Sequence, residues 1–216
     1  MLLIWLIACS RPVLKGPEGP VQDTSAADTS SADTSTADSA QDTAPPCTPL
    51  GAMFFDLGET LVVEGAGDTF DTRDGALALL DALAAGIPRG VITTVPRGYD
   101  LDDLAALLTD PEILESFDVV LLSSQAESRP KPDPAIYAEA LALLPSPPPI
   151  ALAAFLTEEL GDLADADPPT EGAMAAGMIG VHLSDGAPSP LVDHTVATDA
   201  LAGVADAPWV ACVEAE

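Results

Sequence analysis

Short apolar runs alternate with segments of helical spacing along residues 51–216. The runs contain the β-branched and aromatic residues that are typical of strands. Between the runs, apolar residues recur every three or four positions, which is typical of amphipathic helices. This alternation predicts βαβ units and therefore an α/β, three-layer Rossmann-like fold around a mainly parallel sheet, with no large cap domain. The predicted strands are 52–55, 90–93, 118–122, 150–156, 179–183 and 194–197, and a hairpin is expected within 61–70.

Residues with capping chemistry mark the ends of several predicted helices. Asp100 is a suitable N-cap for one helix, and Asp133 followed by Pro134 has the pattern of an N-cap and a first-turn proline. Thr170 is expected to cap a short helix that Gly177 ends. Together with the helix predicted at 75–85, these segments would cover the two faces of the sheet.

Residues 1–9 are expected to be a signal segment. They are almost wholly apolar and end in Leu-Ile-Ala-Cys, which matches a bacterial lipobox with Cys9 as the acyl acceptor. This pattern predicts a bacterial, extracytoplasmic protein that is lipid-anchored at the cell envelope and contacts the membrane through its anchor only. No Lys or Arg precedes the apolar run, so two alternatives stay open: an apolar start that ends in a buried cysteine, and a cytosolic protein.

Residues 10–50 are expected to be a disordered tether in front of a folded domain at 51–216. Asp-Thr-Ser recurs every five residues at Asp23, Asp28 and Asp33, and Asp38 continues the period. A period of five fits neither helix nor strand, and small polar residues bury too little apolar surface to offset the ordering of the backbone. The segment therefore has the composition of a flexible, solvated linker.

The chain is strongly acidic, with 35 Asp and Glu against 7 Lys and Arg and a formal charge of -28. That charge would repel nucleic acid and anionic membrane surfaces, which excludes them as expected partners.

If Cys9 is lipidated, Cys47 and Cys212 remain, one at each end of the domain. In an exported chain such a pair predicts a disulfide, and two unpaired thiols are the alternative.

Polar residues follow four of the predicted strands. Asp56 follows the first, Thr93 and Thr94 end the second, Lys131 lies beyond the third, and Glu158 and Glu159 follow the fourth. The carboxyl ends of parallel strands meet at one edge of a sheet, where open α/β folds bind ligands. We therefore expect these side chains to share a site.

The segments that carry these residues resemble three motifs of the haloacid dehalogenase-like hydrolases. Ala52–Leu61 is similar to the first motif, Arg129–Tyr137 to the third, and Gly172–Met178 to the helix after the fourth, so the resemblance covers about Ala52 to Gly203. It implies that Asp56 is a nucleophile that forms an aspartyl-phosphate. It also implies that Thr93 donates to a phosphoryl oxygen and that Lys131 neutralises the transferring group.

The resemblance further implies a Mg²⁺ site. Asp56 and the carbonyl of Gly58 would be ligands, and an acid after the fourth strand would complete the set. Glu158 and Glu159 are the predicted acids. Further acids follow in a stretch whose register departs from the family pattern: Asp162, Asp165 and Asp167.

Two departures from the family pattern leave the function open. Gly58 stands where most phosphatases of this family carry a second Asp, the general acid/base, and Thr157-Glu158-Glu159 replaces the usual fourth motif. One hypothesis is a Mg²⁺-dependent phosphomonoesterase that acts on a phosphorylated small molecule or macromolecule. The other is a catalytically degenerate domain that serves as a binding or structural module. Arg97 and Arg129 could offset the acidity near the site, although each is expected to be a surface residue.

Overall fold

The structure is a computed structural model that describes residues 48–84 and 86–212. The described residues do not include the predicted signal segment, most of the predicted tether, Cys9 or Cys47. Cys212 is disulfide-bonded, and because the other two cysteines are not described, its pairing with Cys47 stays a prediction. In the part that is described, no helix is both long enough and apolar enough to cross a membrane.

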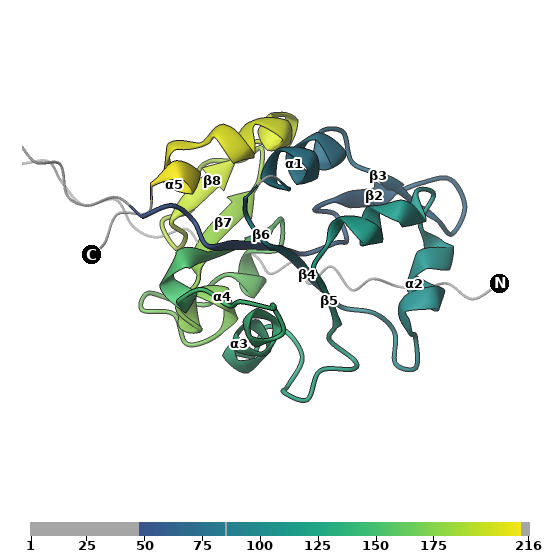
Figure 1. The fold of residues 1–216 in the computed structure, drawn as a ribbon, viewed down its shortest axis with the longest axis horizontal. Helices are drawn as coiled ribbons and strands as arrows, with labels where there is room; N and C mark the ends of the chain where they lie inside the picture. Colours follow the sequence, from purple (N-terminus) through teal and green to yellow (C-terminus); the bar gives the residue numbers. More distant parts are fainter. Residues whose placement is uncertain (1–47, 85, 213–216) are drawn as a thin grey trace, which may run out of the picture. The chain divides into compact units, whose positions relative to one another are not determined.

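A six-stranded sheet forms the centre of the domain (Figure 1), in the order β5-β4-β1-β6-β7-β8. Every neighbouring pair in it is parallel. The fold class predicted from the alternating pattern is therefore confirmed. The strands are β1 (Ala52–Phe55), β4 (Arg89–Thr93), β5 (Val119–Leu122), β6 (Ala153–Thr157), β7 (Ile179–Leu183) and β8 (His194–Val196), and a separate antiparallel hairpin pairs β2 (Val62–Glu64) with β3 (Phe70–Thr72).

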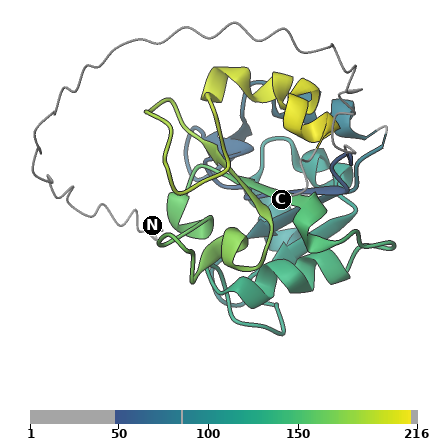
Figure 2. The ribbon, with the colours of Figure 1, turned by 90° about the vertical axis from the view of Figure 1, so that its left-hand side faces the viewer.

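Helices cover both faces of the sheet, as Figure 1 and Figure 2 show from two directions. The α-helices are α1 (Ala76–Leu83), α2 (Leu101–Leu107), α3 (Pro134–Ala142), α4 (Gly172–Ala175) and α5 (Pro208–Ala211). The 3-10 helices are η1 (Pro111–Ser116), η2 (Ile150–Leu152), η3 (Leu160–Asp162) and η4 (Thr198–Asp206). Helix α1 packs with η4 and α5 on one face, whereas α3 and α4 pack on the other.

Strand β1 shows why the core has two halves. Its side chains alternate between the faces of the sheet, so Met53 and Phe55 join the cluster under α1 while Ala52 and Phe54 join the cluster under α3. All four residues are 0 % exposed. A strand that is apolar on both faces is typical of a buried parallel strand, and this explains the uninterrupted apolar run before Asp56.

The described residues between β1 and β4 form the hairpin β2–β3 and helix α1, with no cap domain among them. The hairpin is attached to the end of α2, because the Thr109 N–H donates to the Phe70 carbonyl at 2.9 Å and the Thr109 hydroxyl donates to Asp71 at 2.6 Å. These contacts hold the hairpin next to α2.

Three local predictions differ from the structure. Strand β6 begins at Ala153, since residues 150–152 form the turn η2 after a run of prolines. Thr170 does not cap α4; its hydroxyl donates to Asp165 at 2.6 Å, and Glu171 takes the N-cap position. Leu50, which was assigned to the tether, is 3 % exposed, and its N–H donates to the Val210 carbonyl at 3.0 Å.

Candidate active site at the carboxyl edge of the sheet

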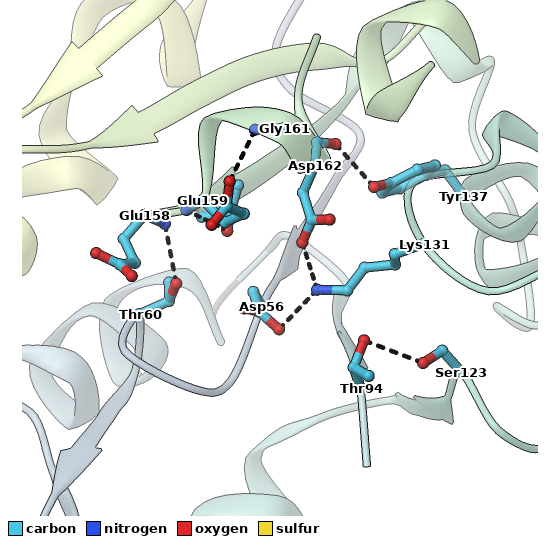
Figure 3. A network of polar contacts seen from close by, with 11 residues as sticks. Asp56, Thr60, Thr94, Ser123, Lys131, Tyr137, Glu158, Glu159, Gly161 and Asp162 are labelled. Carbon is cyan, nitrogen blue, oxygen red and sulfur yellow. Dashed lines mark hydrogen bonds and ion pairs between the residues drawn. The ribbon is translucent and has the colours of Figure 1, made fainter. Parts of the chain in front are cut away.

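Three charged side chains meet at the carboxyl edge of the sheet (Figure 3). The ammonium of Lys131 lies 2.8 Å from Asp56 Oδ1 and 2.6 Å from Asp162 Oδ2. Asp56 follows β1, Lys131 lies in the segment before α3, and Asp162 ends η3 after β6. We call these residues the charged triad. The structure brings Asp56 and Lys131 together as expected, whereas the contact of Asp162 with Lys131 was not predicted.

The charged triad is largely buried. The Lys131 side chain is 4 % exposed, and the Asp56 and Asp162 side chains are 14 % and 12 % exposed. Taking three charges out of water is costly, and their mutual attraction offsets this only when the pairing geometry is good. Such a cluster is weak evidence for stability, and its position at a strand edge where ligands bind favours a chemical role.

Burial and pairing set the protonation of the charged triad. Burial raises the pKa of Asp56 above its usual range, and the Lys131 ammonium opposes that rise. Burial lowers the pKa of Lys131, but the charges of Asp56 and Asp162 outweigh this effect, so the pKa of Lys131 is raised overall. Lys131 therefore stays a cation at neutral pH and supplies a fixed positive charge.

Aromatic residues support the charged triad from the α3 face. The ammonium of Lys131 lies 5.6 Å from the ring centroid of Phe155, and the rings of Tyr137 and Phe155 meet edge to face at 5.0 Å. The Tyr137 hydroxyl donates to the main-chain carbonyl of Asp162 at 2.7 Å. Tyr137 is 0 % exposed, so this bond lies in the core and fixes the position of η3.

A second contact ties the loop after β1 to the loop after β6. Thr60 is 0 % exposed, and its hydroxyl oxygen accepts from the Glu158 N–H at 3.1 Å. His182 Nε2 lies 3.0 Å from the Glu158 carbonyl, which holds the same peptide segment from β7. Sequence reasoning missed this role of Thr60, although Thr60 lies within the motif-like stretch that follows Asp56.

The two predicted acids after β6 have different surroundings. The Glu159 carboxylate accepts from the Gly161 N–H at 3.2 Å and so caps η3. Glu158 is exposed, and its pKa is raised by partial burial and by the negative charges of Glu59 and Glu159. The negative charge of Asp56 adds to this rise in the pKa of Glu158.

The other three acids of this stretch, Asp162, Asp165 and Asp167, have different surroundings. Asp162 belongs to the charged triad, whereas Asp165 is exposed and accepts from the Thr170 and Glu171 N–H groups at 2.7 and 2.9 Å. Asp167 lines a small surface cavity of about 130 Å³ away from the triad. No sequence signal set Asp162 apart from Asp165 and Asp167; Asp162 reaches Lys131 because η3 turns the chain back after β6.

The oxygen atoms near Asp56 can be compared with the ligands that Mg²⁺ prefers. Within residues 48–84 and 86–212, no three His, Cys, Asp or Glu side chains are gathered so as to hold a metal ion. Mg²⁺ does not require such a cage, since it is commonly held by one or two carboxylates with waters and substrate phosphate. The Asp56 carboxylate, the Gly58 carbonyl and the acids after β6 are oxygen donors of the kind that Mg²⁺ prefers.

The structure places the other predicted site residues as follows. Gly58 has open space where a Cβ would stand, so a side chain would fit there. Thr93 ends β4 and is 5 % exposed, while Thr94 is exposed.

The Arg129 side chain is 86 % exposed, and its Nη1 lies 3.9 Å from Asp133 Oδ2. Arg97 is exposed without a hydrogen bond or ion pair to any described residue. Both arginines are surface residues, as expected.

One solved structure resembles most of this chain in its fold. A crystal structure of an uncharacterized protein from Listeria monocytogenes serotype 4b is similar at 20% identity with a TM-score of 0.53, covering 73% of this chain and 96% of that one. This match supports the fold alone. The chain shares with it a three-layer α/β fold around a mainly parallel sheet.

Two further crystal structures are similar with TM-scores below 0.5. CbbY from Rhodobacter sphaeroides in complex with phosphate matches at 23% identity and a TM-score of 0.47, covering 61% of this chain and 56% of that chain. A haloacid dehalogenase-like hydrolase from Streptococcus pneumoniae matches at 16% identity and a TM-score of 0.46, covering 68% of this chain and 93% of that chain. No protein-family profile and no curated protein matches the chain.

Proposed function

We propose that this protein is a Mg²⁺-dependent phosphohydrolase of the haloacid dehalogenase type, with Asp56 as its nucleophile. The observation that carries the proposal is the buried Lys131 ammonium held between Asp56 and Asp162 at 2.8 and 2.6 Å. A fixed cation beside a carboxylate is suited to a reaction in which negative charge builds up on a phosphoryl group. The charged triad lies at the strand ends, where open α/β folds bind ligands, and the Asp56 side chain is 14 % exposed there.

The proposed reaction has two displacement steps. A carboxylate oxygen of Asp56 attacks phosphorus, an aspartyl-phosphate bond forms, and the bond to the leaving oxygen breaks. Water then attacks the same phosphorus, which releases inorganic phosphate and restores the Asp56 carboxylate. Lys131 offsets charge on the phosphoryl oxygens in both steps, and Asp162 holds Lys131 in place. Asp56, Glu158 and the Gly58 carbonyl would hold Mg²⁺, which supplies further charge neutralisation when bound.

Gly58 sets the expected substrate preference. It cannot protonate a leaving group, and general acid help is typically worth about 10²–10⁴-fold. Aryl and acyl phosphates need little protonation on leaving, so they should be cleaved far faster than alkyl phosphates. The open, uncapped edge would also admit a large phosphoester.

The first test compares aryl and alkyl phosphate turnover by the wild type, Asp56→Asn and Gly58→Asp. Turnover of the aryl ester should depend on Mg²⁺ and disappear in Asp56→Asn. Gly58→Asp should raise the alkyl rate selectively, because the site has room for the new side chain. Equal wild-type rates on both esters, or full activity in Asp56→Asn, would contradict the mechanism.

A binding or structural module with the same fold is the second candidate. Gly58, the altered fourth motif Thr157-Glu158-Glu159 and the acidic charge of the chain favour it. Mg²⁺ calorimetry separates the two candidates. Binding that weakens in Asp56→Asn supports the enzyme, whereas no binding at millimolar Mg²⁺ favours the module and turns the search to partners at the envelope.

We also propose that the domain is exported and held at the bacterial envelope through a lipid on Cys9. The lipobox-like sequence and the polar, repetitive segment after it support this location. In a bacterial host that lipidates such signals, a labelled fatty acid should be incorporated into the wild type and not into Cys9→Ser. Incorporation into both proteins, or into neither, would contradict the proposal.

A further inference from the structure

The loop directly after Asp56, residues 57–61, is tight, and we call it the β1 loop. The Leu57 carbonyl accepts from the N–H groups of Leu61 and Val62 at 2.9 and 3.0 Å, which closes the loop on itself. This loop carries the main-chain carbonyl proposed as a Mg²⁺ ligand. The conformation of the β1 loop therefore decides where that oxygen lies.

Glu59, in the middle of the β1 loop, has a backbone conformation that is unfavourable for a residue with a side chain. Its φ is 55°, and in the described ranges 48–84 and 86–212 it is the only non-glycine residue with a positive φ. A residue in this left-handed region is strained by about 1–2 kcal/mol, and it stays there only where surrounding contacts hold it. The β1 loop therefore needs a group that holds the Glu59 peptide.

Arg73, which directly follows β3, supplies this contact. Its Nη2 donates to the Glu59 carbonyl, and its main-chain N–H donates to the Leu61 carbonyl at 2.9 Å. These two carbonyls flank Thr60, whose hydroxyl accepts from the Glu158 N–H (Figure 3). The β1 loop is therefore fixed at Thr60 by the segment after β6 and on both sides of Thr60 by Arg73.

Arg73 differs from the two arginines that were expected to act near the site. It is half-buried, it makes no ion pair with a described residue, and its Nε is buried without a hydrogen bond in the described part of the chain. Burial of a guanidinium without a carboxylate partner costs free energy, which the bonds to the β1 loop offset. Arg97 and Arg129, by contrast, are exposed. The contacts of Arg73 therefore point to a role in the β1 loop.

We infer that Arg73 is a positioning residue: by binding the Glu59 carbonyl, its guanidinium holds the β1 loop, and with it the Gly58 carbonyl, in the conformation that the Asp56 site requires. This inference rests on the proposed function for the use of the Gly58 carbonyl in binding Mg²⁺. Arg73 acts through the backbone of the loop. A change that restores the backbone conformation should therefore restore what the loss of Arg73 removes.

The test measures Mg²⁺ binding by calorimetry with the full chain, and hydrogen exchange at the Leu61 and Val62 amides. Arg73→Met should weaken Mg²⁺ binding and speed exchange at both amides, each by about tenfold, as for one lost hydrogen bond from a charged donor. Arg97→Met removes the same charge from an exposed position and should leave both readouts within about twofold of the wild type. Arg73→Lys keeps the charge without the planar guanidinium and should have a smaller effect, and it replaces Arg73→Met if that variant does not fold.

A second change, at residue 59, separates backbone positioning from charge. Glycine adopts a positive φ without steric cost, whereas glutamine removes the same negative charge as glycine but keeps the Cβ. Arg73→Met should therefore weaken Mg²⁺ binding by about tenfold in a Glu59→Gln background and by less than about threefold in a Glu59→Gly background. Each double variant is compared with its own Glu59 single variant, which cancels the direct effect of the change at residue 59.

The outcomes separate this inference from the proposed function. If the wild type binds no Mg²⁺, the proposed metal site fails, and hydrogen exchange at Leu61 and Val62 in the same variants still tests the hold of Arg73 on the loop. The inference is overturned if Arg73→Met leaves exchange at both amides within about twofold of the wild type. It is equally overturned if the Glu59→Gly and Glu59→Gln backgrounds respond alike, or if Arg97→Met has the same effect as Arg73→Met.

Discussion

Asp162 and Asp165 are three residues apart in the same acidic stretch, and the structure uses them in opposite ways. Asp162 is buried and pairs with the Lys131 ammonium, whereas Asp165 is exposed and accepts hydrogen bonds from Thr170 and Glu171. The first contact joins segments far apart in the chain, and the second closes a local turn. The comparison shows that a carboxylate's neighbours decide whether it serves a site or a loop.

The largest effect should come from removing the cation of the charged triad. Lys131→Met would leave two carboxylates buried without a partner, so we expect a loss of about 3–5 kcal/mol in the free energy of unfolding at neutral pH. Urea unfolding measures this loss. Because the unpaired carboxyls can protonate, the loss should shrink in acid. A loss below about 1 kcal/mol at neutral pH would show that the triad is well solvated and not a buried cluster.

The second prediction contrasts the two aspartates directly. Asp162→Asn removes one of the two charges that hold Lys131, and we expect kcat/KM for an aryl phosphate to fall about 100-fold, as for a lost preorganised electrostatic partner. Asp165→Asn changes the charge of the chain by the same amount and should leave kcat/KM within about twofold. Equal losses in both variants would mean that only the net charge matters.

The third prediction concerns the support beneath Asp162. Tyr137→Phe leaves the Asp162 carbonyl without its buried donor, which should cost about 1–2 kcal/mol of unfolding free energy. Chemical denaturation is the measurement, with Tyr99→Phe, a half-buried tyrosine in the loop after β4, as the control. An unchanged stability in Tyr137→Phe would show that another group satisfies this carbonyl.

The smallest effect is a pH dependence at Asp165. Hydrogen bonds from Thr170 and Glu171 lower the pKa of Asp165 to about 2 from its ordinary value of 3.8. A carboxyl whose pKa is lower when folded stabilises the fold above the ordinary pKa, and this contribution is lost as the pH falls from about 4 to about 2. The Tm difference between wild type and Asp165→Asn should therefore be present at pH 6 and vanish near pH 2. A Tm difference that stays constant from pH 6 to pH 2 would contradict this prediction.

The sequence by itself determined the elements whose signals are local. The apolar run at Ala52–Phe55 gave β1 with its observed bounds, and Asp133 with Pro134 gave the start of α3, where the Asp133 side chain accepts from Ala135. It also placed Asp56 and Lys131 in one site, because parallel strands end at a common edge. These predictions needed only hydrophobic period, capping chemistry and strand direction.

Which acid pairs with Lys131, and which hydroxyl meets Ser123, was settled by tertiary packing. Asp162 reaches Lys131 because η3 turns the chain back after β6, and Tyr137 fixes that turn from another helix. The Thr94 hydroxyl accepts from the Ser123 hydroxyl because β4 and β5 end side by side. Such contacts join residues that are distant in the chain, so no local pattern encodes them, and the packing of the strand-end loops selects them.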